Sequence, residues 1–124
     1  MAAESPPLLV ACLCAAWCRT CDAYQDTLAA VRDAVAGTTS PPPRFVWIDI
    51  EDEHALVDDI DVENFPTLLL ARGDELLFFG TVTPHPQTLE RLVRGAIAGS
   101  LVHAGAPAPE ALALARRLAT HAAL

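Results

Sequence analysis

The sequence predicts an α/β protein in which a central mixed four-stranded sheet is flanked by helices on both faces. Three observations support this prediction: a short apolar run near the start, strand-like and helix-like segments that alternate after it, and two later strand-like segments joined by a turn. A β-α-β unit followed by a β-hairpin and a helix produces such a sheet. The chain has 124 residues and is 52% hydrophobic, which suits one folded domain with a substantial core.

The first expected strand is Leu8–Cys14, a continuous apolar run typical of a buried central strand. A helix is expected next, because apolar residues then recur at helical spacing. The members of this stripe are Cys21, Tyr24, Leu28, Val31 and Val35. Gly37 is expected to cap the end of the helix, and the proline-rich segment after it cannot continue one.

The middle of the chain predicts three more strands. Residues 44–50 are rich in β-branched and aromatic side chains and are expected to form the second strand. The acidic segment 51–62 is expected to form a short helix or helical turn with a solvated face. Residues 67–71 and 75–80 are expected to pair as a hairpin, with the turn at 72–74.

The last third of the chain predicts two helices. The first has one apolar face, made of Leu89, Leu92, Val93, Ala96 and Ile97. The second, Glu110–Ala122, has its own apolar stripe, made of Leu112, Ala115, Leu118, Ala119 and Ala122. We therefore expect one domain over residues 1–98, followed by a linker and an extra C-terminal helix over 99–124 that docks on this domain or on another copy.

Charge and hydropathy exclude several classes of function. The net charge is −8 and the chain contains no lysine, so no basic patch is available for nucleic acid. No segment is long enough to span a membrane. The run that ends at Cys12 resembles a lipoprotein cleavage site, but Glu4 stands where a positive flank is needed. Without an export signal, a cytoplasmic location is expected.

All four cysteines lie between Cys12 and Cys21. In a reducing compartment, such proximity suggests redox chemistry or metal binding more than a structural staple. Cys18 is expected in the first turn of the helix, where unpaired backbone N–H groups and the helix dipole favour the nucleophilic thiolate. Cys21 follows one turn later on the same side, where it is shielded and suited to act as the resolving thiol.

These features together resemble the thioredoxin superfamily. The resemblance rests on the sequence AAWCRTC after a buried strand, on the sequence FPT at the head of the third strand, and on the order of elements from Leu8 to Ala98. It implies a thioredoxin-like fold in which Cys18 attacks a substrate disulfide and Cys21 resolves the mixed disulfide. It also implies that Pro66 is a cis-proline beside the pair.

The same resemblance implies a substrate-binding surface around the cysteine pair. The backbone of Phe65 would pair with an extended substrate chain, and Gly80 would lie near the same rim. Trp17, Phe65 and Phe79 would line an apolar groove.

The sequence departs from the family pattern at several positions, and most of these departures affect the expected chemistry. Cys12 stands where the resemblance places a buried Asp, and the strand that carries Trp47 lacks the expected Lys. A proton relay to the resolving thiol is therefore missing, and its deprotonation is expected to be slower or to use water. Arg19 and Thr20 replace a Gly-Pro pair between the cysteines, and the Arg19 cation is expected to stabilise the Cys18 thiolate. The N-terminal strand and helix of full thioredoxins are also expected to be missing, because only seven residues precede the first expected strand.

Cys12 and Cys14 alternate along the first strand, so both are expected on one of its faces. Their simplest interpretation is as small core residues, because free cysteine is commonly buried. A second interpretation makes Cys12 a third redox thiol that lies under Cys21 and exchanges with it. No metal is expected, because the cysteine spacing does not match paired zinc knuckles. A metal cluster bridged between two chains through Cys18 and Cys21 stays open.

The sequence therefore predicts a thiol–disulfide oxidoreductase that acts on protein disulfides without an organic cofactor. An external reductant, such as a thioredoxin-reductase-type enzyme or glutathione, would restore the dithiol. The alternative is a non-catalytic interaction module or assembly chaperone that uses the groove around Trp17, Phe65 and Pro66. The two cysteines of the pair favour the enzyme, because a binding module needs neither.

Overall fold

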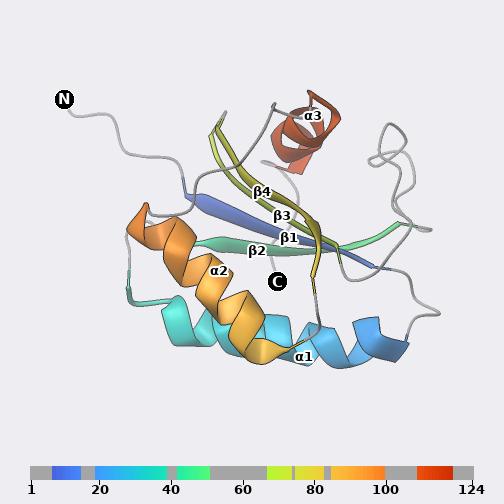
Figure 1. Ribbon diagram of the computed structural model, residues 1–124, viewed down its shortest axis with the longest axis vertical. Helices are drawn as coiled ribbons and strands as arrows, with labels where there is room; N and C mark the ends of the chain where they lie inside the picture. Colours follow the sequence, from blue (N-terminus) through green and yellow to red (C-terminus); the bar gives the residue numbers. More distant parts are fainter. Residues whose placement is uncertain are drawn as a thin grey trace.

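A computed structural model describes residues 7–14, 19–38, 42–50, 67–73, 75–82, 85–99 and 109–118. The acidic segment 51–62, for which a short helix is predicted, lies outside these residues. The described elements are β1 (Leu8–Cys14), α1 (Arg19–Val35), β2 (Arg44–Asp49), β3 (Thr67–Arg72), β4 (Glu75–Thr81), α2 (Pro86–Ala98) and α3 (Pro109–Leu118) (Figure 1).

The four strands form one mixed sheet in the order β2-β1-β3-β4. β1 pairs in parallel with β2 and antiparallel with β3, and β3 pairs antiparallel with β4. Every residue of β1 is buried, as its continuous apolar sequence predicts for a central strand. The predicted sheet and its thioredoxin-like arrangement are confirmed.

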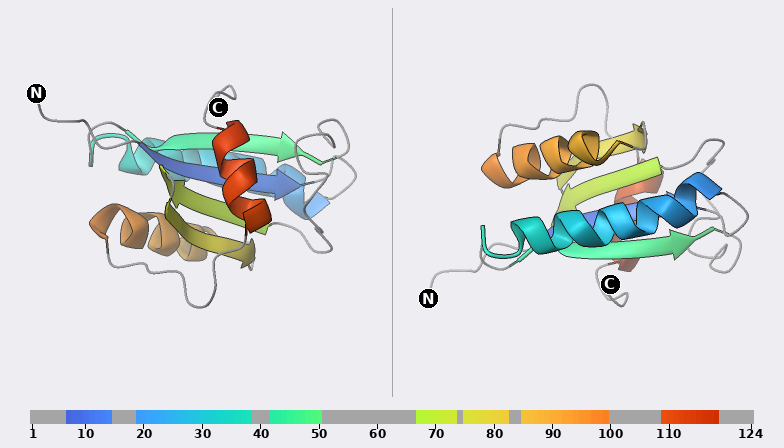
Figure 2. Two further views of the ribbon diagram at one scale, coloured as in Figure 1. Left: turned by 90° about the horizontal axis from the view of Figure 1, so that it is seen from above. Right: turned by 90° about the horizontal axis from the view of Figure 1, so that it is seen from below.

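Helices cover both faces of the sheet. Helices α1 and α2 lie together on one face and α3 lies across the other (Figures 1 and 2). Two separate groups of buried apolar side chains result, one beneath α1 and α2 and one beneath α3. We call the first the α1/α2 face and the second the α3 face.

Helix α1 packs as its sequence pattern predicts, because the whole expected stripe is buried. Its members are Cys21, Tyr24, Leu28, Val31 and Val35. The predicted glycine cap is wrong: among the described residues only Gly73 and Gly99 have positive φ, so Gly37 is not in the left-handed conformation. Instead, the Thr38 hydroxyl donates to the Val35 carbonyl at 2.7 Å and closes the helix end.

Turns and caps fix the second half of the chain. Gly73 adopts a φ of 59° in the β3–β4 turn, which a residue with a side chain rarely adopts. Helix α2 has Pro86 in its first turn, where a missing N–H is harmless, and ends at Gly99 with a φ of 78°.

Helix α3 packs against the sheet of its own chain. Leu114, Ala115 and Leu118 are buried in the group that includes Leu69 and Val46. The sequence stripe missed Leu114. The predicted continuation of the helix over residues 119–122 lies outside the described residues. None of the described helices has both the length and the apolar character that crossing a bilayer requires.

Candidate active site

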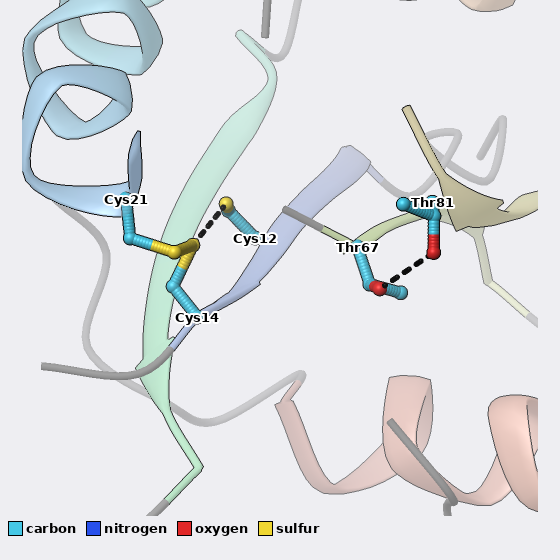
Figure 3. The surroundings of a disulfide bond; sticks show 5 residues. All are labelled: Cys12, Cys14, Cys21, Thr67 and Thr81. Atoms are coloured by element: carbon cyan, nitrogen blue, oxygen red, sulfur yellow. Dashed lines mark hydrogen bonds between the residues drawn. A yellow bond between two sulfur atoms is a disulfide. The ribbon is translucent and has the colours of Figure 1, made fainter. Parts of the chain in front are cut away.

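Three sulfur atoms gather at the end of β1, on its α1/α2 face (Figure 3). Cys12 and Cys14 are two residues apart on this strand, so both side chains point to the same face. Cys21 reaches them from the buried side of the first turns of α1. All three residues are completely buried. The predicted common face of Cys12 and Cys14 is confirmed by the 3.7 Å separation of their Sγ atoms.

Cys14 and Cys21 form a disulfide bond. Their Cα atoms are 5.8 Å apart, which is within the usual range for disulfides. The prediction that Cys14 is a free core cysteine is therefore wrong, and in this structure Cys21 is bonded to Cys14 rather than to the expected Cys18. The reason is packing, because the buried stripe of α1 lies directly over the face of β1 that carries Cys14.

Cys12 is the free cysteine of this cluster. Its burial raises the pKa of the thiol far above the ordinary value of 9.0, so it stays protonated. A disulfide sulfur carries no hydrogen, so the Cys12 thiol is the donor in its contact with Cys14 Sγ. Cys12 therefore places a neutral group at the position where the family resemblance expects a buried Asp.

The interpretation of Cys12 as a third redox thiol assumed that it lies under Cys21, and the structure shows a different arrangement. The Cys12 sulfur contacts Cys14 Sγ, and Cys21 is bonded to the other side of that sulfur. A thiolate is the species that attacks a disulfide, and a thiol held protonated by burial is a poor nucleophile. Trp47 lies opposite Cys12 in the β1–β2 register, half-buried against the same group of side chains.

Tyr24 follows Cys21 by one helical turn and completes the cluster. Its hydroxyl is buried and finds no hydrogen-bond partner among the described residues. Burial, and to a lesser degree the negative charge that Cys12 would carry as a thiolate, raise the pKa of Tyr24. The hydroxyl therefore stays neutral, and sequence spacing gave no sign that it would lack a partner.

The start of β3 lies beside the end of β1, because Thr67 stands opposite Leu13. The side chain of Thr67 is buried, and its hydroxyl is 3.3 Å from that of Thr81 on β4 (Figure 3). Pro66, the expected cis-proline, precedes Thr67 in the chain. Pro66 itself lies outside the described residues.

The rim of the expected substrate groove is only partly described. Gly80 pairs with Leu68 near the start of β3, and it is half-buried. Phe79 packs against the α3 face, on the side of the sheet opposite the cysteine cluster, and its predicted place in a groove with Trp17 stays a prediction. Successive residues of a strand point to opposite faces, and Phe78 is the one that packs on the α1/α2 face.

The remaining predicted site residues divide into two groups. Arg19 is exposed at the start of α1, and only the backbone of Thr20 is described. Trp17, Cys18 and Phe65 lie outside the described residues, so their predicted roles stay predictions. Within the described segments, no group of three or more His, Cys, Asp or Glu side chains is arranged to hold a metal ion.

Comparison with known proteins assigns the family. The family model described as Thioredoxin matches residues 1–93, which is most of the chain, and the protein belongs to this family. No curated protein matches the sequence.

Solved thioredoxin structures share the fold. The mitochondrial thioredoxin 3 of Saccharomyces cerevisiae is 25% identical with a TM-score of 0.59, covering 72% of this chain and 78% of its own. The thioredoxin of Trypanosoma brucei brucei is 23% identical with a TM-score of 0.62, covering 74% and 76%. The germline-specific thioredoxin Deadhead of Drosophila melanogaster is 19% identical with a TM-score of 0.60, covering 71% and 79%. Together with a cysteine pair that forms a disulfide, these similarities point to a redox function.

Proposed function

We propose that the protein is a thiol–disulfide oxidoreductase that exchanges disulfides with protein substrates through Cys18 and Cys21. In the first step, the Cys18 thiolate attacks a substrate disulfide and forms a mixed disulfide. Cys21 then attacks Cys18, which releases the reduced substrate and leaves a disulfide in the protein. An external reductant, of the thioredoxin-reductase or glutathione type, returns the protein to the dithiol in the cytoplasm.

The disulfide at Cys21 is the observation that carries this proposal. It supports a Cys21 that is able to exchange between thiol and disulfide, at the head of α1 and beside the strand end that follows Pro66. α1 is described from Arg19 onward, so Cys18 is the residue next to it in the chain. A thiol at a helix N-terminus is a more acidic and more reactive nucleophile than a buried one.

Protein substrates and a reductant partner are supported in general terms by the related structures. One structure with the same fold concerns thiol resolution in the yeast mitochondrial 1-Cys peroxiredoxin through the glutathione and thioredoxin systems. Its chain is 24% identical to this one, so the substrate of this protein does not follow from it.

The test is disulfide reduction by the purified full-length protein, with insulin as the substrate and dithiothreitol as the electron source. The wild type is expected to accelerate reduction, and Cys18→Ser is expected to abolish the acceleration. Cys12→Ala is the matched control, because it removes a buried thiol of the same cluster that the proposal does not use.

A wild type without activity, or a Cys18→Ser variant with full activity, contradicts the enzyme. The bond between Cys14 and Cys21 favours a second candidate in that case. That candidate is a non-catalytic interaction module in which the disulfide serves as a staple.

A further inference from the structure

The bond between Cys14 and Cys21 occupies the sulfur that the proposed reaction needs. In that reaction Cys21 must be a free thiol that resolves the Cys18 mixed disulfide, yet the structure joins it to Cys14. Cys21 can serve both as the resolving thiol and as the partner of Cys14 if it exchanges between a bond to Cys18 and a bond to Cys14. The bond itself places Cys14 within covalent reach of Cys21.

We propose that Cys14 is a further redox residue, which takes over Cys21 from the Cys18–Cys21 disulfide and frees Cys18. The inference rests on the proposed function, because the Cys18–Cys21 disulfide is a product of that reaction. Its consequence is an oxidised protein whose disulfide lies in the core and whose nucleophile is again a free thiol.

The exchange balances without any added oxidant. The Cys14 thiol loses its proton, and its sulfur attacks Cys21 Sγ. The Cys14–Cys21 bond forms as the Cys18–Cys21 bond breaks. Cys18 departs as a thiolate and takes up the proton that Cys14 has lost, so atoms and charge balance. The exchange itself transfers no electrons to or from the protein. The protein already lost two electrons to the substrate disulfide when the Cys18–Cys21 bond formed.

Solvation of the two competing thiols gives the exchange its direction. The sulfur whose thiolate is more stable is the better leaving group. Cys18 precedes α1 in the chain, where backbone N–H groups favour a thiolate, whereas Cys14 is completely buried in the apolar α1/α2 face. Equilibrium therefore favours a bond between the two buried sulfurs and a free Cys18.

Burial also controls how the internal disulfide is reduced. Cys14 and Cys21 are both inaccessible to a reductant in solution. Cys12 is near Cys14, but both residues are completely buried, so an attack by Cys12 on Cys14 would leave the disulfide in the core and out of reach of a reductant. Reduction of the folded protein therefore runs through Cys18, which attacks Cys21 and carries the disulfide back within reach of the reductant.

The first arm of the test compares disulfide maps after the reduced protein has been oxidised by a substrate disulfide. Wild type, Cys14→Ala and Cys12→Ala are oxidised with insulin, quenched with acid, alkylated and mapped by peptide mass. The wild type and Cys12→Ala are expected to hold Cys14–Cys21 with Cys18 alkylated. Cys14→Ala is expected to hold Cys18–Cys21 instead. A Cys18–Cys21 bond throughout, with normal insulin reduction, overturns the inference and leaves the proposed function intact.

The second arm tests whether Cys18 controls reduction. Oxidised wild type is treated with iodoacetamide to block Cys18, and reduction of Cys14–Cys21 by glutathione is then followed at neutral pH. Blocking is expected to slow reduction on the order of tenfold or more, because the reductant must then wait for the core to open. Equal rates with and without the block overturn the role of Cys18 as the route into the core.

Failure of the proposed function gives a different pattern. In that case the wild type does not reduce insulin at all, whatever its disulfide map. Serine at position 14 is avoided as the test substitution, since a buried hydroxyl without a partner destabilises the fold on its own account.

Discussion

The two faces of β1 belong to the same strand but hold different chemistry. Val10, Cys12 and Cys14 point to the α1/α2 face, and Leu9, Ala11 and Leu13 point to the α3 face. The first face contains three sulfurs, two of them in the disulfide, and a Tyr24 hydroxyl that has no hydrogen-bond partner among the described residues. The second is mainly apolar: its buried group holds no cysteine among the described residues, and Arg44 donates to the Leu118 carbonyl there. Alternation along one strand thus separates a sulfur-containing core from a mainly apolar one, so the apolar face can support the sheet in either state of the proposed disulfide exchange.

Truncation of a leucine on each face is the largest expected change. Leu28 on α1 and Leu114 on α3 are both completely buried. Each Leu→Ala substitution is expected to lower the free energy of unfolding by about 2–5 kcal/mol, through lost burial and an unfilled cavity. Urea unfolding, followed by tryptophan fluorescence and by circular dichroism, measures both.

Equal losses and coincident transitions would mean that the two faces unfold as one unit. A smaller loss for Leu114→Ala, with an unchanged fluorescence transition, would contradict this and would mean that α3 can detach by itself. In that case the α3 face contributes less to the free energy of unfolding of the whole domain than its burial suggests.

The redox state is expected to change the stability of the α1/α2 face next. The Cys14–Cys21 bond closes a short loop with a sequence separation of 7. A loop of this size restricts the unfolded chain by about 2–3 kcal/mol, so phosphine reduction of the wild type is expected to lower the unfolding free energy by that amount. The double variant Cys14→Ala/Cys18→Ala is the control, because it leaves Cys21 with neither of its two proposed partners, and its stability should not respond to the reductant. A full response in that variant would assign the effect to another disulfide.

Tyr24 provides a spectroscopic probe of the α1/α2 face, because it is the only tyrosine in the sequence. Its pKa in the folded protein is raised above the ordinary value of 10.0, so the unfolded chain ionises first as the pH rises. The contribution of Tyr24 to stability is therefore unchanged below about pH 10 and falls above it, with a limiting slope of about 1.4 kcal/mol per pH unit. Cys12, whose pKa is raised from 9.0, adds a decline of the same sign that begins about one pH unit lower.

Absorbance near 295 nm checks this directly, because tyrosinate absorbs there. The folded protein should show no tyrosinate at pH 10.5, whereas protein in urea should be largely ionised. A tyrosinate signal with an ordinary midpoint in the folded protein would contradict the burial of this hydroxyl.

The sequence could predict which side chains are buried on each face of β1, but not which of the buried sulfurs are bonded to each other. Period-two and period-3.6 patterns report which side chains are buried, and they placed β1 and the stripe of α1 correctly. They do not report which buried sulfur bonds to which. The motif C-x-x-C suggested a partner for Cys21 within its own segment, while the bond to Cys14 depends on how α1 lies across β1. The sequence did contain a signal for this bond, because Cys14 lies on the face of the first expected strand that the following helix is expected to cover.

Smaller details of the structure have similarly local causes. Gly37 was expected to cap α1, but the Thr38 hydroxyl satisfies the Val35 carbonyl, so the backbone needs no left-handed residue there. Phe78 and Phe79 were indistinguishable by composition, and only the strand register decides which one faces the cysteines.

The smallest predicted effect comes from removing the Tyr24 hydroxyl. A buried hydroxyl without a partner has lost its water and gained nothing in exchange, so Tyr24→Phe is expected to raise the unfolding free energy by about 1 kcal/mol at neutral pH. The variant should also lose the Tyr24 part of the alkaline decline in stability, while the part that Cys12 causes remains, and this difference is a test independent of the gain at pH 7. Urea unfolding at pH 7 and at pH 10.5 gives both quantities. A destabilised Tyr24→Phe protein would mean that the hydroxyl makes a productive contact, and the α1/α2 face would then hold a polar network instead of an isolated oxygen beside its sulfurs.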